Sequence, residues 1–296
     1  MSKPNGKRFA DKETAKKLKQ ERKLKKTNEH INLKDSQKEK KSKKNKNKVN
    51  KVAINIIAFI CIITIILSSI KIVIWVKDSK ATNKLLSDIQ NKAIINTEQV
   101  TIGDESVTKL HYDFSELLIT NPHTVGWINV SNTNINYPVV QYSDNDFYLD
   151  HSFDNSNNAA GWIFADYKCD MNNLGYNTII YGHNRKDKTM FGSLKNALET
   201  DWLSNKNNHY LNYSTLTENH IYEIFSVFVC NDKDVGAYTR SNFANDSDFA
   251  TYLNKLKNMS SYNFDTDISQ TNKIITLYTC YGLNNQRLLV CAKLID

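Results

Sequence analysis

The pattern of apolar and polar residues divides this 296-residue chain into segments of different character. Residues 1–51 are polar, whereas residues 52–70 form an uncharged, strongly apolar run that ends at Lys71 and resumes over 72–76. As a helix, 19 residues span roughly 28 Å, which is close to the hydrocarbon thickness of a bilayer. The pattern therefore predicts a disordered tail over 1–51 and a transmembrane helix over 52–76.

A weaker helical pattern follows the apolar run. Leu85, Leu86, Ile89 and Ala93 recur at the spacing of one helix face. Residues 77–109 are therefore predicted to form a helical linker ahead of a folded domain. The helix itself is expected over 79–95, and a weaker segment over 96–111 follows it.

Strand signals dominate from residue 125 onward. Short β-branched and aromatic runs are separated by turn-prone residues. Two helical segments interrupt them, and the second is amphipathic, with Ser247 as its predicted N-cap. The predicted strands are 127–130, 135–141, 161–164, 177–181, 210–213, 221–230 and a closing hairpin over 274–295, and the two helices are 191–203 and 248–259. Many short strands with two inserted helices favour a closed, mostly antiparallel β-barrel over 110–296 rather than a parallel α/β sheet.

The charge of the chain is unevenly distributed. Residues 1–51 hold 20 Lys and Arg against 6 Asp and Glu, whereas the remainder holds 19 against 25. A basic tail can bind nucleic acid, but the apolar run beside it favours a role in membrane topology. Positively charged segments that flank a transmembrane helix stay on the cytoplasmic side of the membrane. We therefore expect a cytoplasmic tail and an extracellular domain over 77–296. No Ala-x-Ala-like cleavage site follows the run, which indicates an uncleaved signal anchor.

The closing hairpin carries the clearest candidate chemistry. An apolar run over 274–279 ends in Cys280, six turn-prone residues follow, and Arg287 begins a second apolar run. In that second strand Leu288 and every second residue after it are apolar, so this face is the predicted core. Arg287 then points away from the core, and Cys280 lies on the same side if the two strands pair as their faces suggest.

A cysteine needs a partner to act as a nucleophile, because its ordinary pKa near 8.5 leaves little thiolate at neutral pH. Arg287 offers a permanent charge and a planar fork of donors that suit an oxyanion. Among the histidines, His183 ends the apolar strand 178–181 directly after Gly182 and is the candidate base. Spacing alone does not decide whether Cys280 is a nucleophile or a buried structural cysteine. It also does not decide whether His183 is a base or a solvated histidine.

The sequence contains no clear motif for a metal site or a disulfide framework. The five cysteines include no Cys-x-x-Cys pair. Asp144-Asn145-Asp146 resembles the start of a calcium loop but has Leu149 where that loop needs Gly and Asn155 where it needs Glu. We predict no metal site, and whether Cys230 and Cys291 form a bridge stays open.

Several separated motifs together resemble the sortases, the cysteine transpeptidases of Gram-positive surfaces. Two of them hold the candidate chemistry, and the others resemble class B in particular. They are Tyr181-Gly182-His183-Asn184, Thr276-Leu277-Tyr278-Thr279-Cys280 with Arg287, Asn121-Pro122-His123-Thr124-Val125-Gly126-Trp127-Ile128, Tyr137-Pro138-Val139-Val140-Gln141, Asp144-Asn145-Asp146-Phe147-Tyr148-Leu149 and Met190-Phe191-Gly192-Ser193-Leu194.

The resemblance implies an eight-stranded barrel and specific roles. Cys280 would be the nucleophile, His183 the general acid and base, and Arg287 the group that stabilises the oxyanion and holds the substrate. Five further positions match the substrate groove of class B enzymes, namely Asn145, Leu149, Tyr181, Tyr278 and Thr279.

The resemblance also implies a reaction. The enzyme would cleave a sorting signal resembling Asn/Ser-Pro-x-Thr on surface proteins and pass the product, through a thioester, to a peptidoglycan or pilin amine. No cofactor and no nucleic acid are expected. The short, acid-free connection 281–286 departs from the family pattern. Two other interpretations stay open, a surface cysteine protease that hydrolyses the thioester and a non-catalytic surface module.

Overall fold

The computed structural model describes residues 7–282 and 285–295. The chain divides into two compact units, one that ends at Ile72 and one that begins at Val73. The first helix, α1, covers Lys7–Ala93 and supplies all of the described structure of the first unit. One helix of the described residues is long and apolar enough to cross a membrane, and none of its apolar window is buried.

The tail differs from the sequence-based expectation over its described part. Residues 7–51 are helical, whereas the composition of the tail predicts disorder. The described tail contains neither proline nor glycine, and it is rich in Lys, which is a good helix former. Local propensity accounts for a continuous helix there, although every side chain of 14–51 whose burial is described is exposed.

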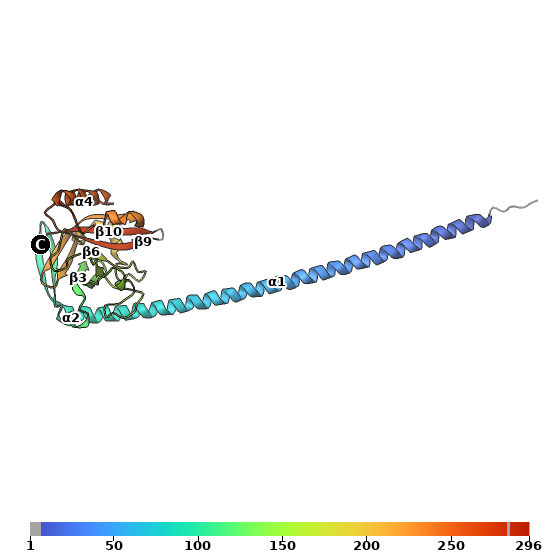
Figure 1. Ribbon diagram of the computed structural model, residues 1–296, viewed down its shortest axis with the longest axis horizontal. Coiled ribbons are helices and arrows are strands. Elements are labelled where there is room, and N and C mark those ends of the chain that lie inside the picture. The colour runs from blue at the N-terminus through green and yellow to red at the C-terminus, as the bar shows by residue number, and fades with distance from the viewer. Residues whose placement is uncertain (1–6, 283–284, 296) are drawn as a thin grey trace, which may run out of the picture. The chain divides into compact units, whose positions relative to one another are not determined.

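The second unit is built from short strands and helices around a barrel (Figure 1). Its strands are β1 Ile94–Ile102, β2 Glu105–Tyr112, β3 Thr124–Val130, β4 Asn136–Val140, β5 Phe164–Ala165, β6 Asn177–Tyr181, β7 Tyr210–Thr215, β8 Asn219–Asn231, β9 Ile274–Tyr281 and β10 Gln286–Leu294. Its helices after α1 are α2 Ser115–Thr120, η1 Phe147–Leu149, η2 Leu194–Leu198, α3 Thr200–Leu203, η3 Lys206–His209, η4 Asp232–Ala237 and α4 Asp246–Met259, where η marks a 3₁₀ helix.

Eight of these strands close into a barrel, in the order β10-β8-β7-β3-β4-β5-β6-β9. The pairs β4–β5 and β6–β9 are parallel, and the other neighbours are antiparallel. The predicted closed, mostly antiparallel barrel of eight strands is confirmed.

The segment predicted as a helical linker contains a hairpin instead. The helix ends at Ala93, and β1 and β2 pair antiparallel across a turn that holds Gly103. Gly103 has a φ of +58°, a conformation that glycine adopts without strain. The β-branched residues of both strands provide the signal that the helical interpretation overlooked.

The closing strands have the predicted phase. Ile275 and Leu277 of β9 and Leu288, Val290 and Ala292 of β10 all belong to the barrel core. Alternation along a strand sends their neighbours to the outer face.

The outer face of these strands is buried as well, over the middle of their length. Leu289 and Cys291 pack there against Phe249, Leu253 and Leu256 of α4, which lies over β10 (Figure 1). The helix begins two residues earlier than predicted, and its N-cap is Asn245 rather than Ser247, since the Asn245 side chain accepts a hydrogen bond from the Asp248 amide. Only the ends of the strands are left to form a site.

Candidate active site

Cys280 and Arg287 face each other directly across the β9–β10 pair. Cys280 is exposed, whereas the Arg287 side chain is only 18% exposed. The turn that joins the strands includes residues 283 and 284, which lie outside the described part of the chain, so the expected atypical connection 281–286 is described only in part. Antiparallel pairing thus brings a thiol and a guanidinium together at one rim of the barrel.

His183 comes to the same rim through the parallel pair β6–β9. Tyr181 lies opposite Tyr278, and the pairing continues one residue further, where the Gly182 amide donates to Tyr278 O over 3.2 Å. The rings of Tyr181 and Tyr278 meet edge to face on the outer side, at 5.1 Å between centroids. Because side chains repeat every second residue, His183 and Cys280 follow on that same side, at the carboxyl ends of neighbouring strands.

A backbone carbonyl orients the His183 ring. Nε2 of His183 lies 2.7 Å from Leu149 O, and because a carbonyl only accepts, this nitrogen carries a proton. Nδ1 is then the nitrogen that holds the lone pair of the neutral ring. Gly161 sits against the ring, and a Cβ at this position would lie 2.9 Å from His183 Cδ2.

Arg287 is held by three different groups. Its Nε donates to the Tyr278 hydroxyl over 2.7 Å, and its Nη1 donates to Gln286 O over 3.0 Å. Its Nη2 pairs with Asp232 Oδ1 at 2.9 Å. Burial lowers the pKa of Arg287, but the Tyr278 hydrogen bond and the nearby Cys280 and Asp232 charges outweigh burial and raise that pKa, so the guanidinium stays charged.

Sequence reasoning missed Asp232. The residue begins η4 directly after β8, and it reaches Arg287 because β8 pairs with β10. The only local signal is an acidic residue at the end of a strand, which has no distinctive spacing from Arg287.

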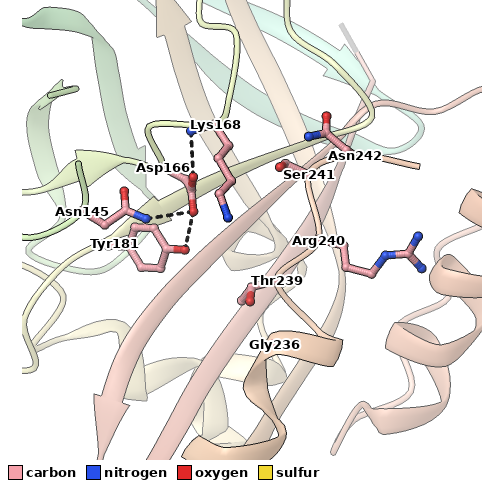
Figure 2. A pocket seen from close by; sticks show the side chains of 9 residues that line it. All are labelled: Asn145, Asp166, Lys168, Tyr181, Gly236, Thr239, Arg240, Ser241 and Asn242. Atoms are coloured by element: carbon pink, nitrogen blue, oxygen red, sulfur yellow. Dashed lines mark hydrogen bonds between the residues drawn. The ribbon is translucent and has the colours of Figure 1, made fainter. Parts of the chain in front are cut away.

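A cavity of about 470 Å³ lies beside Tyr181, and we call it the side pocket. Its lining residues come from the barrel side, from η4 and from the segment after η4, as Figure 2 shows. They are Asn145, Asp166, Lys168, Tyr181, Gly236, Thr239, Arg240, Ser241 and Asn242.

Asp166 organises the barrel side of the side pocket (Figure 2). Its Oδ2 accepts from the Tyr181 hydroxyl at 2.7 Å and from Asn145 Nδ2 at 3.1 Å. Burial, and then the Asp166 carboxylate, raise the pKa of Tyr181, so the phenol keeps its proton. Asp166 was not among the residues singled out from the sequence, whereas Asn145 and Tyr181 were, and both line the side pocket.

The other predicted groove residues have different surroundings. Leu149 is 42% exposed and lies beside His183 through its carbonyl. Tyr278 is partly buried between Arg287 and Tyr181. Thr279, however, is 1% exposed, and its hydroxyl donates to Gly182 O over 2.7 Å. The structure therefore brings Leu149 and Tyr278 to the site and turns Thr279 into the fold.

The remaining candidates show no metal or disulfide chemistry. Asp144 Oδ1 accepts the amides of Asp146 and Phe147, so this carboxylate caps η1. Within residues 7–282 and 285–295, no group of three or more His, Cys, Asp or Glu is arranged to hold a metal. Cys230 and Cys291 are both buried and free.

Comparison with known proteins points to one family. The family model described as the sortase domain matches residues 128–295. Sortase B of Listeria monocytogenes is 33% identical over 202 residues, which are 67% of this chain and 80% of that protein. The crystal structure of sortase B from Bacillus anthracis in complex with AAEK1 superposes with a TM-score of 0.63 at 33% identity, covering 74% of this chain and 99% of that one. The Staphylococcus aureus sortase B–substrate complex superposes with a TM-score of 0.58 at 33% identity, covering 62% of this chain and 84% of that one.

Proposed function

Because this chain belongs to the sortase family, as a class B member and thus a cysteine transpeptidase, we propose that Cys280, His183 and Arg287 carry out its chemistry. The observation that supports this assignment best is the strand pairing. Arg287 lies opposite Cys280 across β9–β10, and the β6–β9 pair brings His183 to the carboxyl end of the neighbouring strand.

In the first half of the reaction His183 takes the proton of the Cys280 thiol, and the resulting thiolate attacks the carbonyl carbon of the substrate threonine. The carbonyl oxygen becomes an oxyanion, which the Arg287 guanidinium stabilises. His183 then gives a proton to the leaving amine, the peptide bond breaks, and a thioester joins the substrate to Cys280.

In the second half an amine attacks the thioester. His183 takes the proton that the amine loses, the new amide forms, and Cys280 leaves as thiolate. The catalytic groups in these steps, Cys280, His183 and Arg287, are all side chains of the protein. The single exposed thiol of the rim suits such a covalent intermediate, since both substrates must reach the same sulfur.

We propose a sorting signal resembling Asn/Ser-Pro-x-Thr as the substrate. Its threonine would lie at Cys280, and its preceding residues would cross Tyr278 and Tyr181 toward the side pocket. The amide and hydroxyl groups of Asn145, Thr239 and Asn242 suit a polar first residue there. The acceptor would be an amine of peptidoglycan or of a pilin.

Acyl-enzyme formation tests this proposal. The full chain in mild detergent is mixed with a panel of sorting peptides, and the intact mass is measured. We expect Cys280→Ala to abolish the added peptidyl mass, and Cys291→Ala, at a cysteine buried in the layer between β10 and α4, to retain it. Retained turnover by a folded Cys280→Ala variant would contradict the assignment.

Product analysis separates transfer from hydrolysis. With an added amine, a transpeptidase gives the amide product, whereas a surface protease gives the free acid at every amine concentration. A protein that forms neither thioester nor product would be a non-catalytic module.

We also propose that residues 52–76 anchor the enzyme in the cell membrane, with the tail 1–51 in the cytoplasm and the catalytic unit outside. The uncharged run and the basic tail support this arrangement. Protease treatment of intact protoplasts should degrade the catalytic unit and leave the tail protected. Degradation of the tail alone would contradict the orientation.

A further inference from the structure

Asp232 occupies a fixed position beside the start of β10. It is the first residue of η4, and its amide donates to Asn285 O over 2.8 Å. The residue before it, Asn231, pairs with Gln286 across the β8–β10 ladder. The backbone of Asp232 is thus held from two sides, and its carboxylate is directed to Arg287 at 2.9 Å.

The donors of Arg287 can be counted. A guanidinium has five N–H groups in a rigid plane. The contacts to Tyr278, Gln286 and Asp232 use one N–H each, on Nε, Nη1 and Nη2 respectively. One N–H then remains on each terminal nitrogen, and two such donors suit a carbonyl oxygen or an oxyanion.

Arg287 also lies between the Asp232 carboxylate and the thiol that is proposed to react. Cys280 is across the ladder on β9, and Asp232 is at the end of β8 on the other side. Without the carboxylate, Nη2 would lose its partner, and the guanidinium, held then only by Tyr278 and Gln286, could turn toward the Cys280 thiolate and pair with it. A guanidinium paired with the nucleophile in this way has fewer donors for the oxyanion.

We propose that Asp232 is a positioning residue of the transpeptidase, which holds the Arg287 guanidinium so that its two remaining donors meet the oxyanion rather than the thiolate. This inference rests on the proposed roles of Cys280 and Arg287. Tyr278 holds Nε of the same guanidinium, whereas Asp232 holds Nη2. The two residues together set the position and the tilt of the guanidinium plane.

Steady-state kinetics of the full chain in detergent test the proposal. A fluorogenic sorting peptide is cleaved with excess amine, and kcat and KM are measured separately. For Asp232→Asn we expect kcat to fall about 3- to 10-fold, as for the loss of one half-exposed charged hydrogen bond, with KM within about twofold. Asp232→Glu keeps the charge and should recover most of the kcat.

Two controls separate positioning from a general effect. Asp234→Asn removes another exposed carboxylate from the same 3₁₀ helix and should leave kcat unchanged. Because salt screens a half-exposed pair, raising the salt concentration should lower the kcat of the wild type toward that of Asp232→Asn. The melting temperature of each variant shows whether it is folded.

The outcomes are distinct. A kcat for Asp232→Asn that is unchanged, raised, or reduced no more than that of Asp234→Asn overturns the proposal, and so does a loss confined to KM. A folded but equally slow Asp232→Glu also overturns it. Cys280→Ala is run beside these variants. If it turns over peptide, the proposed function fails, whereas if it is inactive and Asp232→Asn is normal, only the positioning role fails.

Discussion

Gly161 is the position at which one methyl group should disturb both the fold and the histidine. It has a φ of +60°, and an added Cβ would lie 2.6 Å from Tyr148 O, 2.8 Å from Leu149 O and 2.9 Å from His183 Cδ2. Two of these neighbours are backbone atoms that cannot swing aside. Leu149 O is also the acceptor for His183 Nε2, so relief of the contact moves the atom that orients the ring.

The loss of unfolding free energy caused by Gly161→Ala can be worked out by comparison with Gly103. That residue has nearly the same φ, +58°, but a Cβ there would meet no atom within 4 Å. Both Ala substitutions therefore cost about 1–2 kcal/mol of unfolding free energy through backbone strain. Gly161→Ala adds an overpacking cost of about 1–3 kcal/mol. For a unit of this size that difference corresponds to about 2–12 °C in melting temperature.

Thermal unfolding of residues 73–296 and peptide turnover measure the two effects. We expect Gly161→Ala to melt below Gly103→Ala and to show a kcat at least about 10-fold lower, because misplacement of a catalytic group by a fraction of an ångström is costly. Gly103→Ala should keep its kcat. Equal melting temperatures with equal kcat values would refute the reasoning that Gly161 is needed for space beside His183.

Three other substitutions or treatments give further predictions. Leu256→Ala, in the buried layer between α4 and the barrel, should lower the unfolding free energy by about 2–5 kcal/mol in chemical denaturation, and a change under about 1 kcal/mol would argue against that layer. Burial raises the pKa of Asp187, but hydrogen bonds, chiefly from Arg185, outweigh burial and hold that pKa well below 3.8. The stabilisation is therefore complete above about pH 4 and is lost as the pH falls further, so Asp187→Asn should be less stable at neutral pH and lose less stability in an acid titration. Burial raises the pKa of Cys291 to about 12, so an alkylating agent at pH 8 should modify Cys280 and leave Cys291 intact in a peptide-mass map.

Local patterns in the sequence determined the parts of this protein that depend on short-range periodicity. Alternation along 274–295 was enough to place Cys280 and Arg287 outside the barrel core, and the pairing of the two strands confirms that register. The 3.6-residue period of 248–259 predicted α4 to within two residues at its start. These features are decided by which face of one element is apolar, and that information lies within a few neighbouring residues.

The sequence-based errors also have local causes. The helical stripe from Leu85 to Ala93 predicts the end of α1 to within two residues. The weaker segment after it is a hairpin, which the β-branched residues around Gly103 indicate. The N-cap of α4 was placed at Ser247, but Asn245 caps equally well and its carbonyl also accepts the amide of Phe249. Helix and strand boundaries depend on small differences among nearby polar residues.

Only the tertiary structure decided which distant residues share the rim. His183 and Cys280 are 97 residues apart, and they come to the same rim because β6 and β9 pair in parallel, which no local period specifies. Asp232 reaches Arg287 only because β8 is the second neighbour of β10, and Asp166 reaches Tyr181 only because β5 pairs with β6. The sequence by itself determined which residues carry the candidate chemistry and which faces they occupy. Closure of the barrel determined their partners, since it joins strands whose contacts depend on the whole chain.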